Sequence, residues 1–322
     1  MKGASILVTG GAGFIGSNLV EGLLNDPRVG FVRVLDNLAT GNKSNLTEFL
    51  DDSRLEFMEG DICDYDTCIQ AMEGIDLITH QAALGSVPRS IQNPLKTNEV
   101  NITGTLNVFT AAREVGIRRV VYAASSSTYG DSQTLPKTED VIGNPLSPYA
   151  VTKVVSELYA RVYAQLYNME FVGLRYFNVF GPKQSPGGPY AAVLPLFVKA
   201  LLTGEAPTIH GDGLQSRDFT YVANAVQANL LALFTDNQDA LNQVYNIAYG
   251  EQTTLLDLFE KLKGISGVSL DAFHGPTRTG DVRHSLADIS KARTLLGYDP
   301  AFDIDKGLKA AFDWYASVKM FH

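Results

Sequence analysis

The stretch Thr9-Gly10-Gly11-Ala12-Gly13-Phe14-Ile15-Gly16 decides how this chain folds. A short apolar run, Ser5–Thr9, precedes it, and apolar residues recur after it at helical spacing as far as Leu24. The order is therefore strand, glycine-rich turn, helix. The glycines at 10, 13 and 16 allow a sharp turn and let a pyrophosphate approach the first N–H groups of the helix. This pattern predicts a parallel α/β sheet that binds a dinucleotide at its first turn.

A carboxylate stands where a dinucleotide site needs one. The second predicted strand, Phe31–Leu35, ends at Asp36, twenty residues beyond Gly16. A carboxylate in this place accepts hydrogen bonds from an adenosine ribose and repels a 2′-phosphate. No arginine occupies position 37 or 38, where a phosphate partner would be expected. The sequence therefore favours NAD over NADP, and the alternative is a glycine-rich turn that binds nothing.

Strands and helices alternate through the rest of the first half. Further strands are expected at 55–58, 77–80, 120–123 and 171–175, and long amphipathic helices at about 94–115 and 149–167. We expect an α/β fold, a Rossmann-type doubly wound parallel sheet with a smaller C-terminal α/β lobe. Residues 1–177 form the NAD-binding domain, with a return segment near 219–247, and 178–322 form a discontinuous substrate-binding lobe. His80, at a strand end, is expected to be packed and hydrogen-bonded rather than catalytic.

Composition narrows the class of partner. The chain has 322 residues, is 45% hydrophobic and has a formal net charge of −9, which argues against nucleic acid or an anionic membrane surface. No run is long enough to span a membrane, and the first apolar run is too short for a signal peptide, so a cytoplasmic protein is expected. The two cysteines, Cys63 and Cys68, fit neither a zinc site nor a CxxC pair, and no metal is expected.

Tyr149 and Lys153 suggest the chemistry. On a helix, residues four apart share a face, so the lysine ammonium can lie beside the phenol and lower its pKa from about 10. Ser125, at the end of the strand 120–123, is placed to share a hydrogen bond with the substrate hydroxyl that loses its proton. The alternative is an ordinary amphipathic helix, because Tyr-x-x-x-Lys also arises by chance.

Nine segments together resemble a known family: TGGAGFIG, DNLATG, GDI, HQAALGSVPRSI, AASSSTYGD, SPYAVTK, GLRYFNVFGPKQ, GDGLQSRDFTYV and GDVRHSLADI. The chain resembles the extended short-chain dehydrogenase/reductases and, within them, the nucleotide-sugar 4-epimerases. It is most similar to bacterial enzymes that interconvert UDP-N-acetylglucosamine and UDP-N-acetylgalactosamine, or their uronic acids. The resemblance covers nearly the whole chain, and it implies bound NAD and a homodimer that pairs the two long helices.

The resemblance also implies roles for individual residues. Tyr149 would remove the 4-hydroxyl proton while hydride passes to NAD, Lys153 would hold the nicotinamide ribose and lower the tyrosine pKa, and Ser125 would assist at O4. Hydride would then return to the other face of the sugar. The implied cofactor contacts are Gly10, Gly13, Phe14, Ile15, Gly16, Asp36, Asn37, Thr40, Gly41, Asp61, Ile62, Gln81, Ala82, Tyr149, Lys153 and Phe177.

The implied substrate contacts are Ser86, Ser125, Ser126 and Tyr149 for the sugar, and Asn178, Ala192, Val193, Arg217 and Arg283 for the UDP moiety. A guanidinium matches phosphate oxygens, although either arginine could form a structural salt bridge instead. One departure from relatives is Val100, where a polar residue often faces the cofactor.

Three serines bear on the choice of reaction and sugar. Related dehydratases have Asp-Glu at the positions of Ser126 and Ser127, and related decarboxylases have a glutamate at the second, so epimerisation is favoured. Ser285 stands where a small residue leaves room for an N-acetyl group, which favours a UDP-N-acetylhexosamine. A UDP-N-acetylhexosaminuronic acid or UDP-glucose 4-epimerase, a UDP-sugar decarboxylase and an NAD-binding sensor remain as alternatives.

Overall fold

The computed structural model describes residues 3–187, 192–276 and 283–318. Its centre is a seven-stranded parallel sheet with the strand order β11-β6-β5-β4-β1-β2-β3. The strands are β1 (Ala4–Thr9), β2 (Val29–Asp36), β3 (Leu55–Glu59), β4 (Leu77–His80), β5 (Arg119–Ser125), β6 (Glu170–Tyr176) and β11 (Gln243–Ile247). The order reverses between β1 and β4, so their carboxyl ends open the crevice where ligands bind in such sheets.

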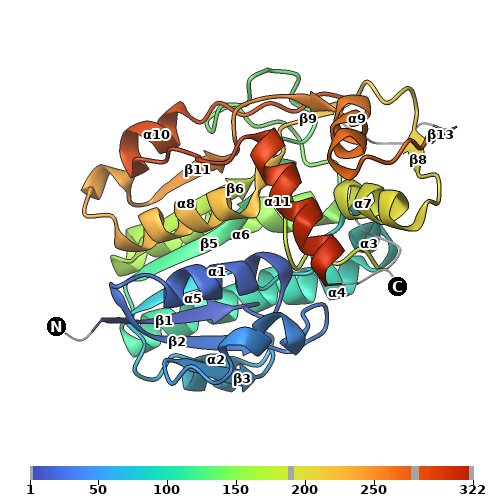
Figure 1. Cartoon of the computed structure of the whole chain (residues 1–322). Coiled ribbons are helices and arrows are strands. Elements are labelled where there is room, and N and C mark those ends of the chain that lie inside the picture. Colours follow the sequence, from blue (N-terminus) through green and yellow to red (C-terminus); the bar gives the residue numbers. More distant parts are fainter. Residues whose placement is uncertain (1–2, 188–191, 277–282, 319–322) are drawn as a thin grey trace.

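Helices cover both faces of the sheet (Figure 1). One apolar core contains residues of α1 (Phe14–Leu24), α8 (Val222–Phe234) and α10 (Ser290–Leu296). The opposite core contains residues of α2 (Tyr65–Ala71), α5 (Thr105–Val115) and α6 (Pro148–Tyr167). Parallel strands buried on both faces are typical of this fold, and the Rossmann-type α/β class expected from the sequence is confirmed.

A smaller group of elements lies beside the sheet, at the upper right of Figure 1, away from α2 and β3. It shares a third apolar core and includes α7 (Val193–Thr203), α9 (Leu255–Ser266) and α11 (Ile304–Ser317). Its short strands pair as β7 (Val179–Phe180) with β10 (Thr220–Tyr221), β9 (Ser216–Arg217) with β12 (Thr253–Thr254), and β8 (Thr208–His210) with β13 (Phe273–Gly275).

The long helix expected at 94–115 is interrupted. Its first part, α4 (Pro94–Asn98), continues into the π-helical turn η2 (Glu99–Gly104) and then into α5. A π turn inserts one extra residue per turn and often marks a functional site. The helix α3 (Val87–Gln92) and the short helices η1 (Lys43–Phe49), η3 (Ser126–Tyr129) and η4 (Gln238–Ala240) complete the described elements.

The chain crosses twice from the smaller group back to the sheet. The first crossing, α8 and β11, falls within the return segment expected near 219–247. A second comes near the C-terminus, where Ala287, Ile289, Ala292, Leu296 and Tyr298 join the core of the sheet. The sequence-based division did not include this second segment, and the division at residue 177 stays a prediction.

Candidate active site and adjoining cleft

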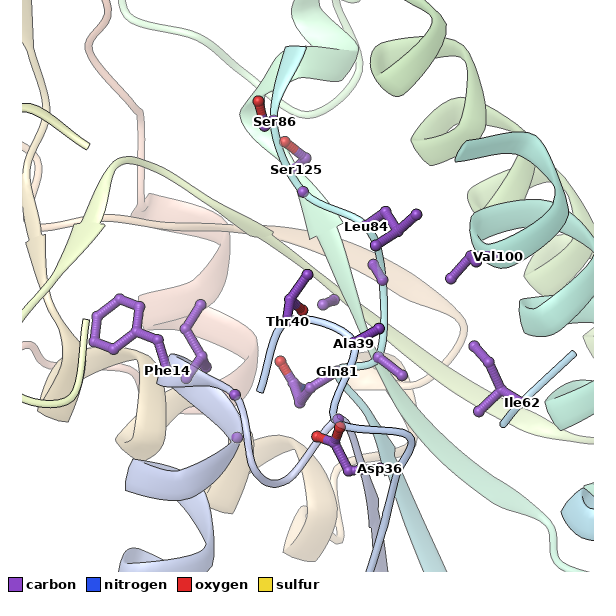
Figure 2. A pocket seen from close by; sticks show the side chains of 18 of the residues that line it. Phe14, Asp36, Ala39, Thr40, Ile62, Gln81, Leu84, Ser86, Val100 and Ser125 are labelled. Atoms are coloured by element: carbon purple, nitrogen blue, oxygen red, sulfur yellow. The ribbon is translucent and has the colours of Figure 1, made fainter. Parts of the chain in front are cut away.

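A cavity of about 520 Å³ lies over the carboxyl ends of the central strands (Figure 2). In the figure Asp36 lies at one end, Ser86 and Ser125 lie at the other, and Ile62 and Val100 lie along one side. The cavity brings together seventeen of the residues implied by the sequence: Gly10, Gly13, Phe14, Ile15, Gly16, Asp36, Asn37, Thr40, Asp61, Ile62, Gln81, Ala82, Ser86, Ser125, Tyr149, Lys153 and Asn178.

The glycine turn forms one wall and fits a pyrophosphate. Gly10 has φ +70°, and Gly13 is the N-cap of α1 without a side-chain cap, so the first N–H groups of this helix face the cavity. Exposed N–H groups at a helix N-terminus bind anions. A Cβ on Gly16 would lie 2.1 Å from the carbonyl oxygen of Gly10, so the turn and the helix touch at their backbones.

The expected ribose partner, Asp36, is buried at the end of β2, where backbone N–H groups fix its carboxylate. Oδ2 accepts a hydrogen bond from Ala12 N at 2.9 Å, and Oδ1 accepts one from Leu38 N at 2.8 Å. The negative charge is thus held against the cavity in one orientation. Gly41 does not line the cavity, but a Cβ there would lie 3.0 Å from Asp36 Oδ2, so this glycine leaves space for the carboxylate.

The proposed catalytic side chains converge from β5 and α6. Helix α6 begins at Pro148, and its N-cap Ser147 accepts a hydrogen bond from Ala150 N at 3.1 Å, which places Tyr149 in the first turn. The buried Lys153 donates a hydrogen bond from Nζ to the carbonyl oxygen of Ala123 at 2.7 Å. Its Nζ lies 5.9 Å from the centroid of the Tyr149 ring.

Burial dominates the ionisation of both groups. It raises the pKa of Tyr149, while the hydrogen bond between the Ser125 hydroxyl and the phenolic oxygen acts in the opposite direction. It also lowers the pKa of Lys153 to about 8, against the opposing charge of Glu157. Loss of solvation of the phenolate is the larger of these two effects on Tyr149, and the lowering of its pKa expected from Lys153 stays a prediction.

Asn101, in the π turn, links the cavity to the catalytic helix. Its Oδ1 accepts a hydrogen bond from Leu84 N at 2.7 Å, and its Nδ2 donates to Leu84 O at 3.1 Å and to Thr152 Oγ1 at 3.2 Å. Thr152 Oγ1 in turn donates to Tyr149 O at 2.7 Å. The cavity loop at Leu84 and the helix that bears Tyr149 are thereby held together through one side chain.

His80 is packed and hydrogen-bonded, as expected. Its Nδ1 lies 2.7 Å from Thr9 Oγ1 and its Nε2 lies 3.0 Å from Thr105 Oγ1. Burial lowers the pKa of this imidazole to about 3, so the ring is neutral at physiological pH. It connects β1 and β4 below the cavity, and both ring nitrogens already have partners.

A second cavity of about 460 Å³ lies beside the first, and Asn178 lines both. Its walls come from α7, β8 and β9 and include Val193 and Arg217 from the expected substrate contacts. Ala192 is exposed and caps α7 immediately before Val193. Arg217 Nη1 donates to the carbonyl oxygens of Ser216 at 2.9 Å and Arg283 at 3.2 Å, which orients its guanidinium at the cavity wall.

Four other implied contacts line neither cavity. Arg283 is exposed, and its Nη2 lies 2.8 Å from Asp212 Oδ2, which is the salt bridge weighed as the alternative. Ser285 N donates to Ser216 O at 3.1 Å, beside Arg217.

Phe177 is fully buried, with its ring 5.8 Å from that of Tyr129. Ser126 begins η3 directly after Ser125.

Sequence reasoning missed several residues of both walls. In the first cavity they include Ala123, Ala124 and Tyr176, which a search of strand ends could have found, since ligands bind there in parallel sheets. In the second they include Phe197, Lys199, Thr208, His210 and Phe219. Their positions follow no spacing rule, because separate elements of the smaller group bring them together.

Within residues 3–187, 192–276 and 283–318, no helix is both long and apolar enough to cross a membrane. In the same part of the chain, no group of three or more His, Cys, Asp or Glu side chains could hold a metal ion.

The chain is similar to known proteins of one family over most of its length. The model of the NAD dependent epimerase/dehydratase family matches residues 6–248. A putative UDP-glucose 4-epimerase of Methanocaldococcus jannaschii is 38% identical over 96% of this chain and 97% of its own. The solved UDP-N-acetylglucosamine 4-epimerase of Methanobrevibacter ruminantium, in complex with UDP-N-acetylmuramic acid, is 38% identical, has a TM-score of 0.93, and the match covers 99% of this chain and 100% of that one.

A third relative differs in its sugar. The UDP-glucuronic acid 4-epimerase of Bacillus cereus, solved with UDP-glucuronic acid and NAD, is 33% identical with a TM-score of 0.90, and the match covers 98% of this chain and 99% of that one. The glycine turn of this chain and the helix that follows it fit NAD, the cofactor in the Bacillus cereus structure. From the family match, the extent of these likenesses and the fit of the cavity to NAD, the chain belongs to the NAD-dependent epimerase/dehydratase family.

Proposed function

We propose that this chain is a UDP-sugar 4-epimerase that uses bound NAD and whose preferred substrate is a UDP-N-acetylhexosamine. One observation supports it above others: two cavities meet at Asn178, one lined by the glycine turn with Ser125, Tyr149 and Lys153, the other by Arg217. We assign the dinucleotide and the sugar to the first cavity, of about 520 Å³, and the uridine diphosphate to the second, of about 460 Å³. The glycine turn and Asp36 would hold NAD, whose nicotinamide would supply hydride chemistry at C4 of the sugar.

The side chains of the chain itself manage the proton. Tyr149 takes the proton of the 4-hydroxyl and later returns it, while Ser125, already hydrogen-bonded to the phenol, holds O4. Lys153 is fixed by Ala123 O and keeps a positive charge near the phenol, which favours its ionised form in the reacting complex. The small residues Ala82, Ala83 and Gly85 leave the sugar free to turn over in the cavity.

The absence of an acid at two positions favours epimerisation over elimination or decarboxylation. Ser126 and Ser127 follow Ser125, and Ser127 N donates to Ser125 Oγ at 3.1 Å. Neither serine can protonate a leaving hydroxyl as a carboxylic acid would. UDP-glucose and UDP-uronic acids remain alternative substrates, because relatives named for both sugars match over nearly the whole chain.

The first experiment offers purified protein three substrates separately: UDP-N-acetylglucosamine, UDP-glucose and UDP-N-acetylglucosaminuronic acid, without added reductant. We expect the galacto epimer from the N-acetylated hexose, resolved by anion-exchange chromatography. Conversion of UDP-glucose alone, or of the uronic acid alone, would keep the chemistry and change the substrate. No epimer from any of the three would overturn the proposed function.

Ser285→Tyr tests the preference for an N-acetyl group. Ser285 is half-buried next to β9, so a phenol here would project from a segment bonded to the wall that contains Arg217. We expect kcat/KM for UDP-N-acetylglucosamine to fall by at least ~100-fold, and that for UDP-glucose to change by less than about threefold. Unchanged turnover of the N-acetylated substrate would contradict the role given to Ser285.

We also propose a homodimer formed through α6. Val151, Leu158, Val162 and Leu166 are exposed on this helix at spacings that place them along one stripe, and Leu95 of the adjacent α4 is 83% exposed. Exposed apolar stripes of this kind mark interfaces. We expect this stripe to pack against the same stripe of a second copy of the chain, since a two-fold axis pairs identical surfaces.

Leu158→Glu with Leu166→Glu should therefore convert the protein to a monomer in size-exclusion chromatography with light scattering. The control is Leu50→Glu, an exposed leucine directly after η1, which should leave the mass unchanged. A wild-type protein that is monomeric at micromolar concentration would refute the dimer.

A further inference from the structure

Asp218 is a buried carboxylate that lines neither cavity and yet holds their surroundings in place. It lies between β9 and β10 with no exposed surface. Its Oδ1 accepts hydrogen bonds from Tyr249 N and Gly250 N, and its Oδ2 accepts from Gly250 N and Ala287 N, at 3.1 to 3.2 Å. The carboxylate thus binds the backbones of two separate parts of the chain, 249–250 and 287.

One of those parts is the segment 283–287, which lies along β9. Ser216 N donates to Arg283 O at 3.0 Å, Ser285 N donates to Ser216 O at 3.1 Å, and Ser216 Oγ lies 2.8 Å from His284 Nδ1. Arg217 Nη1 donates to the same Arg283 carbonyl. The position of the Arg217 guanidinium at the second cavity therefore depends on where this segment lies, and Asp218 fixes the end of the segment at Ala287.

Asp218 also contacts Asn178, the residue that lines both cavities. Asn178, which lines both, donates from Nδ2 to the backbone oxygen of Asp218 at 3.1 Å. Asn178 has φ +36°, a backbone conformation that needs support from its surroundings. Residue 218 therefore contacts Asn178, which lines the second cavity, and the segment 283–287, which holds the Arg217 guanidinium at its wall.

The geometry requires a carboxylate and not an amide. Both oxygens accept from N–H groups, so each must be an acceptor. Asparagine has the same size but presents an NH₂ in place of one oxygen, and that NH₂ would face a backbone N–H. A donor facing a donor in a buried place forces one segment to move away.

We propose that Asp218 is a positioning residue for the diphosphate of the substrate: it acts through Arg217 and the segment 283–287 and touches neither substrate nor cofactor. The inference rests on the proposed function, which assigns the second cavity to a uridine diphosphate. Because Asp218 is separate from Ser125, Tyr149 and Lys153, its loss weakens binding and spares the chemical step.

Asp218→Asn is the test. We expect KM for the UDP-sugar and Kd for UDP, measured by titration calorimetry, each to rise by about tenfold or more, with kcat within about twofold of wild type. The NAD content of the purified protein should not change. The matched control is Asp313→Asn on α11, an exposed aspartate paired with Lys309, which should alter none of these quantities.

A second variant tests the same segment from its surface. His284→Ala removes the contact with Ser216 Oγ at an exposed side chain, and should raise KM by about threefold without changing kcat. If the Asp218→Asn protein does not fold, the His284→Ala variant provides the test. An unchanged KM in His284→Ala would then overturn the inference.

A fall in kcat with unchanged KM in Asp218→Asn, or unchanged affinity for UDP, would also overturn it. Failure of the proposed function gives a different result: the wild-type protein would epimerise no UDP-sugar, whatever its affinity for UDP. Calorimetry with UDP alone therefore separates the two failures.

Discussion

Tyr149→Phe is expected to lower kcat by about 10²–10⁴-fold, the range for loss of a general base, while NAD stays bound. The change removes only the phenolic oxygen, which is hydrogen-bonded to Ser125. The backbone oxygen of residue 149 still accepts from Thr152 Oγ1, and Lys153 keeps its bond to Ala123 O, so the fold around the cofactor is retained. The measurements are epimer formation by chromatography and the NAD content of the purified protein.

The control for this variant comes from the same helix. Tyr167 ends α6, is 42% exposed, and has its ring against Arg113. Tyr167→Phe should leave both turnover and NAD content unchanged. Turnover of Tyr149→Phe within about tenfold of wild type would contradict the role of the phenol as the base, since that loss lies below the range for general base catalysis.

Gly16→Ala is expected to abolish retention of NAD through purification and to destabilise the fold. The new Cβ would lie 2.1 Å from Gly10 O and 2.8 Å from Gly11 Cα. Both are backbone atoms, so the turn itself must move, at a cost of about 1–3 kcal/mol in overpacking. The N–H groups at the start of α1 then no longer face the pyrophosphate together. NAD content after purification and the midpoint of thermal unfolding measure the two effects.

Gly264→Ala is the matched control. Gly264 lies inside α9, and a Cβ there meets no atom within 4 Å. The same substitution should therefore leave NAD content unchanged and stabilise the protein by about 0.4–1 kcal/mol. A Gly16→Ala protein that retains a full complement of NAD would show that the turn and helix need not approach so closely.

Most of the sheet could be predicted from sequence because its strands are short, largely apolar runs that end in polar or small residues, but β11 was expected only as part of the return segment near 219–247. The strand at 77–80 has the expected bounds, while β2 begins two residues earlier and β5 runs on to Ser125. Strand ends are set by hydrogen bonds to neighbours, which no local pattern records. The π turn at 99–104 was not predictable either, because Asn101 is held by Leu84 and Thr152, which lie far from it in the sequence.

The first cavity could be predicted more fully than the second. Asp36 and the glycines act through local backbone geometry that their spacing already specifies. The walls of the second cavity come from α7, β8 and β9, and Arg283 pairs with Asp212 across seventy-one positions. These contacts depend on how the elements of the smaller group pack. Residues such as Arg217 and Arg283 were therefore predicted from the family resemblance alone. Asp218 lies in the quoted segment GDGLQSRDFTYV, but no local pattern predicted its contacts with 249–250 and 287.

The position of β11 at the edge of the sheet has a consequence for biosynthesis. β6 ends at Tyr176, and its outer partner is Gln243–Ile247, so some sixty-six residues must be made before this edge is closed. Until then the nascent chain presents an apolar strand with unpaired N–H and C=O groups, which favours association with other chains. The ribosome adds residues at about 5–20 per second, so the interval lasts several seconds. Chaperone demand during translation should be greatest in that interval.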